Sequence, residues 1–401
     1  MAKMTLSQSE YQNRIQRIRE ELAGRQLNAL YLTGDTSILY TTGFSHISTE
    51  RPAALIVPLD GEITFMGPVI ERDHIEAAAP IIKRIYSYLD YPGETHPMDL
   101  FAGWLKEIGL GNKSIGIDNP AGASGRWGYT GSPISEKVPE AKFVKAKDIV
   151  ESLRLIKSDE EITLIRESSK WATVAHRFLQ KFTKPGLWDV EVSLKASLEA
   201  SREMKKKLGL QYEKTRSGLG SATAGFRGQV GEGSAIPHAI SIRRKIRKGD
   251  VLVTGAGADV GGYSAELERT MMMGKPTEKQ EKYFEIMVKM QDAALDTFGP
   301  VVKCSDVDHA TINVAREQGV ADYLLHHTGH GIGLEGHEPP WLDQGNDELL
   351  RPGMVVSCEP GIYVPGFAGF RHSDTVLITK EGAELITSYP RDLRSLTIPA
   401  K

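Results

Sequence analysis

Hydrophobic positions in the first part of the chain follow two different spacings. From Tyr11 to Leu22 they recur every three or four residues, after the capping-box pair Ser7 and Glu10 and before Gly24, which predicts one amphipathic helix. Shorter apolar segments predict strands at 29–32, 53–57, 63–66 and 114–117, separated by helix-like stretches around 72–79 and 97–108. This alternation predicts an N-terminal α/β domain.

The pattern changes near residue 150. Ser158 and Glu161 form a second capping box ahead of a long helical pattern, so we predict a domain boundary that separates residues 1–150 from residues 151–401. Beyond the boundary the helical blocks come in pairs that precede strand-like segments, and these blocks are 159–182, 187–207, 277–297 and 305–318. Such runs predict an α+β domain, so the fold class expected for the chain is α+β, with a smaller α/β domain in front.

Composition and charge exclude several classes of protein. The chain has 401 residues with 49 Lys and Arg against 52 Asp and Glu, and this balance favours neither nucleic acid nor a membrane surface as a partner. We interpret the basic run Arg243–Lys248 as a solvated hairpin. Cys304 and Cys358 lie far apart, which argues against a disulfide framework or a thiolate zinc site. The N-terminus is polar and no apolar run reaches the length of a membrane span, so we expect a cytoplasmic protein.

Glycine is over-represented, at 40 of 401 residues, and its clusters surround titratable groups. Four segments place such groups in glycine-rich or strand-like surroundings, and they are residues 234–238, 251–270, 326–341 and 355–361. Glu266 and Glu268 are two residues apart, which puts both on one face of a strand. His330 and His337 lie among glycines, and Glu359 is the only charge in an apolar run, where a carboxylate needs a cation, hydrogen bonds or a ligand. Each feature alone is common in surface structure, but together they predict a functional pocket.

The same segments resemble a known family. The motifs that carry the resemblance are Thr-Gly-His-Gly-Ile-Gly-Leu-Glu-Gly-His-Glu at 328–338, Pro-Gly-Met-Val-Val-Ser-Cys-Glu-Pro-Gly at 352–361 and Asp-Thr-Val-Leu-Ile-Thr at 374–379. They are similar to those of the pita-bread family (peptidase M24-like), which includes aminopeptidase P, prolidase, methionine aminopeptidase and creatinase. The N-terminal domain and the Ser158 helix match in order and spacing too, so the resemblance covers essentially the whole chain. It implies a catalytic pita-bread domain behind a creatinase-type N-terminal domain.

The peptidases of this family hold two divalent metal ions with five ligands. The resemblance places these positions at Gly255, Glu266, His330, Glu359 and Ser373. A two-metal site needs carboxylates that bridge the ions and offset their charge, and glycine and serine supply none. We therefore expect no metal cofactor, with one divalent ion at Glu266, His330 and Glu359 as the alternative.

Creatinase, a member that works without metal, gives a fuller match. The resemblance places its essential histidine and two glutamates at His238, Glu268 and Glu359, which are the expected catalytic residues. Its two arginines for the substrate carboxylate fall at Arg51, which is kept, and at Trp341, which is not. The substrate-binding residues expected from the resemblance are Phe44, Arg51, Glu266, His330, His337 and Trp341.

These observations predict a metal-independent hydrolase that cleaves a C–N bond, in an amidino, amide or cyclic amidine group, of a small zwitterionic or cationic substrate. His238 would move protons while Glu268 and Glu359 hold a cationic group. Two alternatives stay open: an Xaa-Pro dipeptidase or aminopeptidase P with a rebuilt one-metal site, and a non-catalytic binding protein. The resemblance also implies a homodimer in which the Phe44–Arg51 segment of one subunit covers the pocket of the other.

Overall fold

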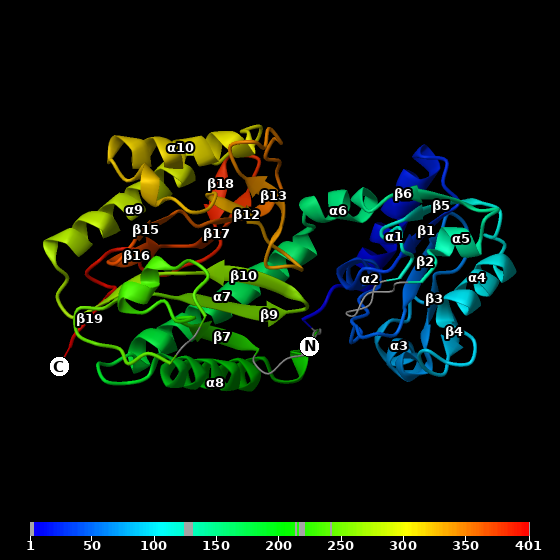
Figure 1. Ribbon diagram of the computed structural model, residues 1–401, viewed down its shortest axis with the longest axis horizontal. Helices are drawn as coiled ribbons and strands as arrows, with labels where there is room; N and C mark the ends of the chain where they lie inside the picture. The colour runs from blue at the N-terminus through cyan, green and yellow to red at the C-terminus, as the bar shows by residue number, and fades with distance from the viewer. Residues whose placement is uncertain (1–3, 124–130, 213–214, 216–220, 241–242, 401) are drawn as a thin grey trace. The chain divides into compact units, whose positions relative to one another are not determined.

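The computed structural model describes residues 4–123, 131–212, 215, 221–240 and 243–400. The chain divides into two compact units, Leu6–Arg154 and Leu155–Lys401, and the residues before Leu6 join the second unit (Figure 1). This division falls within helix α6 (Asp148–Leu155), slightly later in the chain than residue 150, where the sequence pattern changes.

The N-terminal unit is built on a six-stranded mixed sheet. Its strand order is β4-β3-β2-β1-β5-β6, and β1 is antiparallel to β2 but parallel to β5. The first helix begins as the sequence predicts, because the Ser7 hydroxyl accepts a hydrogen bond from the Glu10 backbone N–H at 3.1 Å. The strands are β1 (Ala29–Leu32), β2 (Ala54–Pro58), β3 (Thr64–Pro68), β4 (Arg84–Tyr88), β5 (Ser114–Ile117) and β6 (Lys142–Lys145). The helices are α1 (Gln8–Gly24), α2 (Asp35–Thr42), η1 (Val69–Glu71), α3 (Arg72–Ala78), α4 (Pro97–Glu107), α5 (Ile134–Lys137) and α6.

The C-terminal unit consists of two helix pairs that pack against β-sheets. Helices α7 and α8 contact β7 and α7 also contacts β9 and β10, whereas α9 and α10 pack against the strands of the other half (Figure 1). The helices are α7 (Asp159–Phe182), α8 (Asp189–Leu208), η2 (Gly209–Gln211), η3 (Gly231–Ala235), α9 (Glu278–Thr297), α10 (Cys304–Glu317) and η4 (Ala321–Tyr323). The strands are β7 (Ala222–Gly225), β8 (Val251–Val253), β9 (Gly255–Val260), β10 (Tyr263–Leu267), β11 (Thr270–Met273), β12 (Gly329–Gly331), β13 (Glu338–Leu342), β14 (Val355–Cys358), β15 (Gly361–Val364), β16 (Ala368–Arg371), β17 (Asp374–Ile378), β18 (Ala383–Leu385) and β19 (Thr397–Ile398).

Two local features of the sequence fix the start of α7 and the β9–β10 turn. At the capping box, the Ser158 hydroxyl accepts from the Glu161 N–H at 3.3 Å and the Glu161 carboxylate accepts from the Ser158 N–H at 2.8 Å. At the turn, Gly261 and Gly262 have φ of 60° and 86°, the left-handed region that glycine adopts without a steric penalty. The turn sets the register of β10 and so directs the Glu266 side chain.

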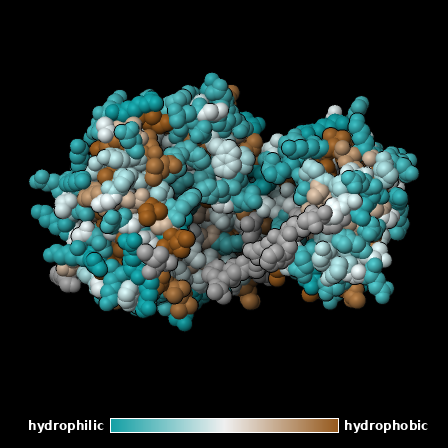
Figure 2. All heavy atoms as spheres, viewed as in Figure 1, coloured by the Kyte–Doolittle hydropathy of each residue, from teal (hydrophilic) through white to brown (hydrophobic). Residues whose placement is uncertain are grey.

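Hydrophilic residues predominate on the face of the molecule in Figure 2, and hydrophobic residues occur there in small groups. Among the described helices, none combines the length and the apolar character that a membrane span requires.

Candidate active site

Four strands of the C-terminal unit bring the predicted site residues together. Glu266 lies on β10 and His330 on β12, while Glu359 follows the end of β14 and Ser373 precedes β17. Backbone bonds of 3.0 Å in each direction pair Glu268 with Ser373. The side chains therefore converge because neighbouring strands hold them in register, although they are far apart in sequence.

His330 and Glu359 form a buried ion pair. His330 Nε2 lies 2.9 Å from Glu359 Oε1, and His330 Nδ1 donates to the Gly331 carbonyl at 3.0 Å. Burial works to lower the pKa of His330, but the bond to Glu359 and the charges of Glu266 and Glu359 raise it to about 9. Burial works to raise the pKa of Glu359, and the His330 bond and charge overcome it and lower that pKa to about 2. Both groups are therefore charged at neutral pH.

Glu266 is the protonated carboxyl group of the site. The Ser373 hydroxyl donates a hydrogen bond of 2.5 Å to Glu266 Oε1. Burial, followed by the negative charges of Glu359 and Glu268, raises the pKa of Glu266 to about 8. At neutral pH the group is mainly the neutral acid, which can donate a proton.

Glu268 is bound by arginines rather than left open to the pocket. Arg371 donates from Nε and Nη2 to the two carboxylate oxygens, with 2.9 Å between Nη2 and Oε1, and Arg227 Nη2 lies 3.4 Å from Oε1. Glu268 and Arg371 are both buried, so their charges offset each other in a medium that screens weakly. Sequence reasoning did not include Arg371, which stands two residues before Ser373.

Tyr363 and His326 extend this network. Arg371 Nη1 donates to the Tyr363 hydroxyl at 3.0 Å, and that hydroxyl lies 2.8 Å from His326 Nε2. His326 Nδ1 is 2.8 Å from the His327 carbonyl, which can only accept, so Nδ1 carries the proton and Nε2 accepts from Tyr363. Sequence reasoning did not include Tyr363 either, because a tyrosine in an apolar strand gives no local signal of this role.

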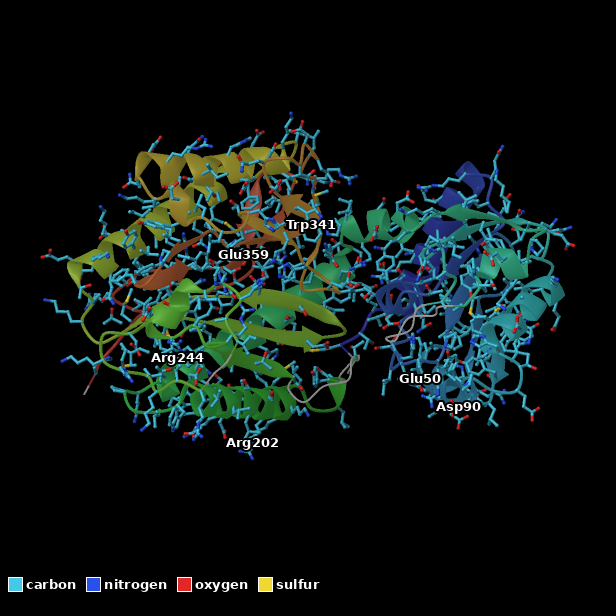
Figure 3. All side chains as sticks on the ribbon, in the orientation of Figure 1. Glu50, Asp90, Arg202, Arg244, Trp341 and Glu359 are labelled. Atoms are coloured by element: carbon cyan, nitrogen blue, oxygen red, sulfur yellow. The ribbon has the colours of Figure 1, made fainter. Side chains whose placement is uncertain are left out.

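Histidines also form the outer wall of the site. The rings of His330 and His337 stack with 3.6 Å between centroids, and His337 is exposed. Burial and the charge of His330 lower the pKa of His337, and His238 is close enough to lower it further. His238 is also exposed. Trp341 is 40% exposed and its ring lies 6.2 Å from that of His327, at the same wall (Figure 3).

The other two predicted site residues belong to the N-terminal unit. The Phe44 ring is fully buried and packs against Phe65 and His74, with centroid distances of 5.5 and 4.9 Å. Arg51 Nε lies 2.8 Å from Asp90 Oδ1. Within their own unit, these side chains contact protein groups, and their predicted contacts with substrate stay predictions.

The donor groups present fit one divalent ion but not two. Ligand atoms of Glu266, His330 and His337 all lie within 4.8 Å of one another, and the same holds for Glu266, Glu268 and Glu359. Gly255 and Ser373, at the other two metal-ligand positions of the family, supply no carboxylate. A Cβ at Gly255 would lie 3.2 Å from Glu268 Oε1, so this position faces a carboxylate already bound by arginine.

Known proteins match both units of the chain. A profile of metallopeptidase family M24 matches residues 163–380, and one of the creatinase/prolidase N-terminal domain matches residues 14–156. The chain belongs to metallopeptidase family M24. An Xaa-Pro dipeptidase from Pyrococcus horikoshii is 28% identical to this M24 chain over 95% of the chain and 98% of its own length.

Solved structures of the family show the same fold. The Xaa-Pro dipeptidase from Bacillus anthracis is 27% identical, with a TM-score of 0.80 over 96% of this chain and 99% of its own. Dipeptidase PepE from Mycobacterium ulcerans is 26% identical, with a TM-score of 0.83 over 99% of this chain and 100% of its own. The pita-bread resemblance and the two-domain α+β fold are therefore confirmed, and the family is one of hydrolases.

Proposed function

We propose that this M24 chain hydrolyses a carbon–nitrogen bond in a small substrate with its own acids and histidines, without a two-metal centre. The observation that carries the proposal is the pair of positions Gly255 and Ser373. The first has no side chain to bind a metal, and the hydroxyl of the second donates to Glu266. The serine hydroxyl donates a hydrogen bond to the Glu266 carboxyl group and adds no negative charge, so the two positions supply nothing that would offset the charge of a second cation.

Hydrolysis requires a proton for the departing nitrogen and a base for the attacking water. Glu266 fits the first role, because its raised pKa of about 8 keeps it protonated at neutral pH. His337 and His238 fit the second, because both are exposed and the charge of His238 reaches His337, and the lowered pKa of His337 keeps its imidazole neutral. The sequence-based assignment of His238 to proton transfer thus stays part of the proposal.

The remaining charges favour a substrate with a cationic or polarised nitrogen group. Glu359 stays ionised beside His330 and can accept hydrogen bonds from an amidinium or ammonium group. Glu268 is less available for this role than the sequence suggests, because Arg371 binds both of its oxygens. We therefore propose that Glu359 binds the cationic nitrogen group of the substrate. Glu268 instead holds Arg371 in place.

The second candidate is an Xaa-Pro dipeptidase with one metal ion, and the comparisons favour it. The relatives described above are dipeptidases by name, and the chain aligns with them over nearly its whole length. Glu266, His330 and Glu359 would hold the ion, after the bonds from Ser373 and between His330 and Glu359 give way. A bound divalent ion would polarise the scissile carbonyl and lower the pKa of water.

Metal analysis together with activity assays separates the two candidates. The protein is purified without added metal, its metal content is measured, and Xaa-Pro dipeptides and a panel of guanidino, amide and cyclic amidine compounds are tested before and after chelation. We expect turnover of a panel compound by metal-free protein, unchanged by the chelator. Bound manganese or zinc with chelator-sensitive dipeptide cleavage would establish the second candidate instead.

One variant tests the proton-transfer role in the same assay. His238→Ala should lower kcat by about 100-fold, the usual contribution of a positioned acid or base. His309→Ala is the matched control, because His309 is exposed on α10 and belongs to no part of the site. Equal activity of the two variants would remove His238 from the mechanism, and no turnover of any compound by the wild type would leave the non-catalytic alternative.

A further inference from the structure

A cavity of the C-terminal unit lies outside the active site. It has a volume of about 490 Å³ and is lined by Trp188, by the start of η3 and by part of the segment 243–250. The sequence predicts a solvated hairpin for this basic segment, whereas the structure ties it to α8. The Arg244 N–H donates to Asp189 Oδ1 at 2.9 Å, and the Asp189 N–H donates to the Arg244 carbonyl at 2.9 Å.

The charge of this cavity is positive. Its charged lining residues are the cations Arg243, Arg244, Lys245 and Arg247 and the carboxylates Glu232 and Asp250. Within the described part of the chain, no carboxylate pairs with the side chain of Lys245 or Arg247, although the Arg247 backbone N–H donates to Asp250 Oδ2 at 2.7 Å. The Arg244 Nε atom is buried without a hydrogen-bond partner among the described residues. A buried donor of this kind is costly unless a ligand or water accepts from it.

Trp188 holds two of these cations close together. Arg243 Cζ lies 4.4 Å and Lys245 Nζ 5.0 Å from the centroid of the indole ring, whose faces attract cations. Arg243 has a φ of 57°, a left-handed conformation that a non-glycine residue adopts only where its surroundings hold it. The indole ring therefore gathers both cations, and Arg243 Nη2 also lies 3.6 Å from Glu191 Oε1.

Glycine makes room for the Arg244 side chain. A Cβ at Gly233 of η3 would lie 2.9 Å from Arg244 Cζ and 2.9 Å from the Gly228 carbonyl. The guanidinium therefore lies against bare backbone at the cavity wall. The hollow at the end of α7 is also basic, because three lysines and one carboxylate line it, namely Lys181, Lys184, Lys195 and Glu191.

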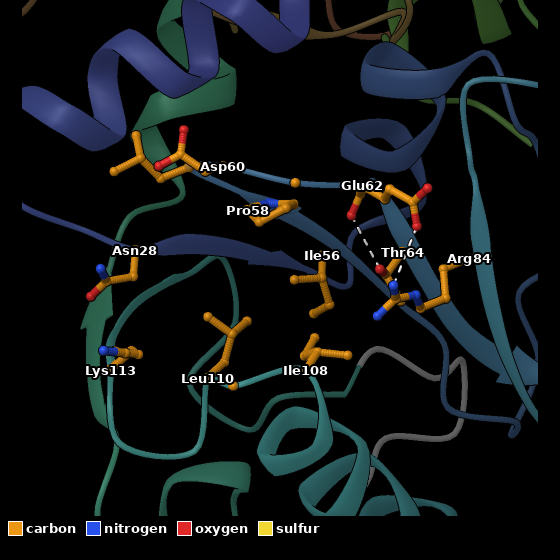
Figure 4. A pocket seen from close by; sticks show the side chains of 13 residues that line it. Asn28, Ile56, Pro58, Asp60, Glu62, Thr64, Arg84, Ile108, Leu110 and Lys113 are labelled. Atoms are coloured by element: carbon orange, nitrogen blue, oxygen red, sulfur yellow. Dashed lines mark hydrogen bonds and ion pairs between the residues drawn. The ribbon is translucent and has the colours of Figure 1, made fainter.

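The N-terminal unit has a cavity of about 290 Å³ that lacks these properties (Figure 4). Its arginine, Arg84, lies 3.3 Å from Glu62 Oε2, and Ile56, Ile108 and Leu110 form much of its wall. That cavity offers no concentration of positive charge.

We infer that the cavity at Trp188 binds a small dianion, namely phosphate or a phosphate monoester, through Arg244, Lys245 and Arg247. The lining cations outnumber the lining carboxylates, and the positive charge that remains after Glu191 offsets Arg243 attracts such a ligand. Arginine also presents a planar fork of donors that fits phosphate oxygens. Arg244 and Glu359 lie apart in Figure 3, so the ligand would occupy a place other than the active site.

A chain of contacts through η3 and β16 connects the cavity at Trp188 to the active site. η3 lines the cavity at Gly231, and its Ser234 hydroxyl accepts from the Gly369 N–H at 2.8 Å. Gly369 belongs to β16, which ends at Arg371, the residue that binds Glu268. A ligand that fixes η3 would therefore also fix the strand that carries Arg371.

Titration of the purified full chain with inorganic phosphate tests the inference. Binding is followed by calorimetry and by tryptophan fluorescence, with chloride at equal ionic strength as the reference. We expect saturation with a Kd below about 1 mM, and an increase in Kd of about tenfold or more in Arg244→Gln and in Lys245→Gln. Arg202→Gln, which removes an exposed cation from α8, should leave the Kd unchanged.

The outcomes separate specific binding from charge screening. A chloride response equal to that of phosphate, or a Kd unchanged in Arg244→Gln and Lys245→Gln, would overturn the inference. If circular dichroism shows that Arg244→Gln does not fold, the Kd of the Lys245→Gln variant, which changes an exposed residue, decides whether the inference holds. Glycerol 3-phosphate in place of phosphate identifies the source, since tighter binding of the monoester assigns a phosphorylated metabolite and tighter binding of phosphate assigns the free ion.

Discussion

Single residues set the protonation of the active site. Burial and the charges of two neighbouring carboxylates raise the pKa of Glu266 to about 8, although the hydrogen bond from Ser373 works to lower it. His330 is held between the Gly331 carbonyl and Glu359, and its pKa is raised to about 9. Each of these groups therefore holds its proton more tightly in the folded chain than in the unfolded chain, which links their ionisation to stability.

The first prediction concerns this pH dependence. Stability from a raised pKa is complete below the unfolded values of 4.5 for Glu266 and 6.5 for His330, and it is lost as pH rises through the folded values of about 8 and about 9. The free energy of unfolding should therefore fall between pH 5 and pH 9. Glutamine cannot ionise, so the free energy of unfolding of Glu266→Gln should fall less over this range than that of the wild type, by roughly 2 kcal/mol or more.

Urea unfolding of chelator-treated protein at a series of pH values measures this difference. Glu381→Gln, which changes an exposed glutamate of the same unit, should follow the wild type. If Glu266→Gln and the wild type lose stability in parallel, the Glu266 carboxyl group is already ionised in the folded protein. The proposed proton donor would then be wrong.

At the scale of elements, a buried ion pair joins the start of α7 to the histidine wall. Lys157 Nζ lies 2.8 Å from Glu338 Oε1, and the two side chains are 1% and 3% exposed. Lys157 precedes the capping box of α7, and Glu338 begins β13, directly after His337. A Cβ at Gly333 would lie 2.7 Å from Glu338 Oε1, so a glycine leaves room for the pair.

Removal of one partner should cost much more than removal of both. Lys157→Met leaves a buried carboxylate without its cation, and we expect it to lower the free energy of unfolding by about 3 to 5 kcal/mol. The double variant Lys157→Met with Glu338→Leu should recover most of that loss. Arg166→Ala, which breaks an exposed pair with Glu384, should cost less than about 1 kcal/mol. Denaturant unfolding checks all three, and equal losses in the single and double variants would contradict the explanation.

At the scale of the whole molecule, Arg51 is the residue through which we predict that two subunits share a site. The family resemblance implies a homodimer in which Arg51 of one subunit reaches the pocket of the other. Arg51 is bound to Asp90 in its own unit, with side chains that are 29% and 58% exposed, so this surface pair can exchange for a substrate carboxylate at small cost.

A variant of Arg51 tests this arrangement. The protein should sediment as a dimer, and Arg51→Ala should raise KM about tenfold, the effect of one lost charge-assisted bond, without changing the urea midpoint. Arg84→Ala removes another arginine of the same unit and should leave KM unchanged. A monomeric protein, or an unchanged KM in Arg51→Ala, would show that the pocket is completed within one chain. The cytoplasmic location also stays a prediction.

The sequence by itself determined the long helices, many of the strands and some of the residues that converge, among them Glu266, His330 and Glu359. Hydrophobic spacing, the Ser158 capping box and the Gly261–Gly262 turn are local features, and local features act over a few residues of chain. The residue types at 255 and 373 are also known from the sequence alone, and neither glycine nor serine carries a carboxylate.

Only the tertiary structure decided which charges meet. Arg371 and Glu268 are far apart in sequence, yet their ion pair changes Glu268 from a free substrate contact into a bound one. The protonation of Glu266 likewise depends on Glu359 and on burial, and the basic segment beside Trp188 forms a cavity only once α8 packs against it. These properties escape sequence reasoning because charge interactions depend on distance and on the surrounding dielectric, which are set when the chain folds.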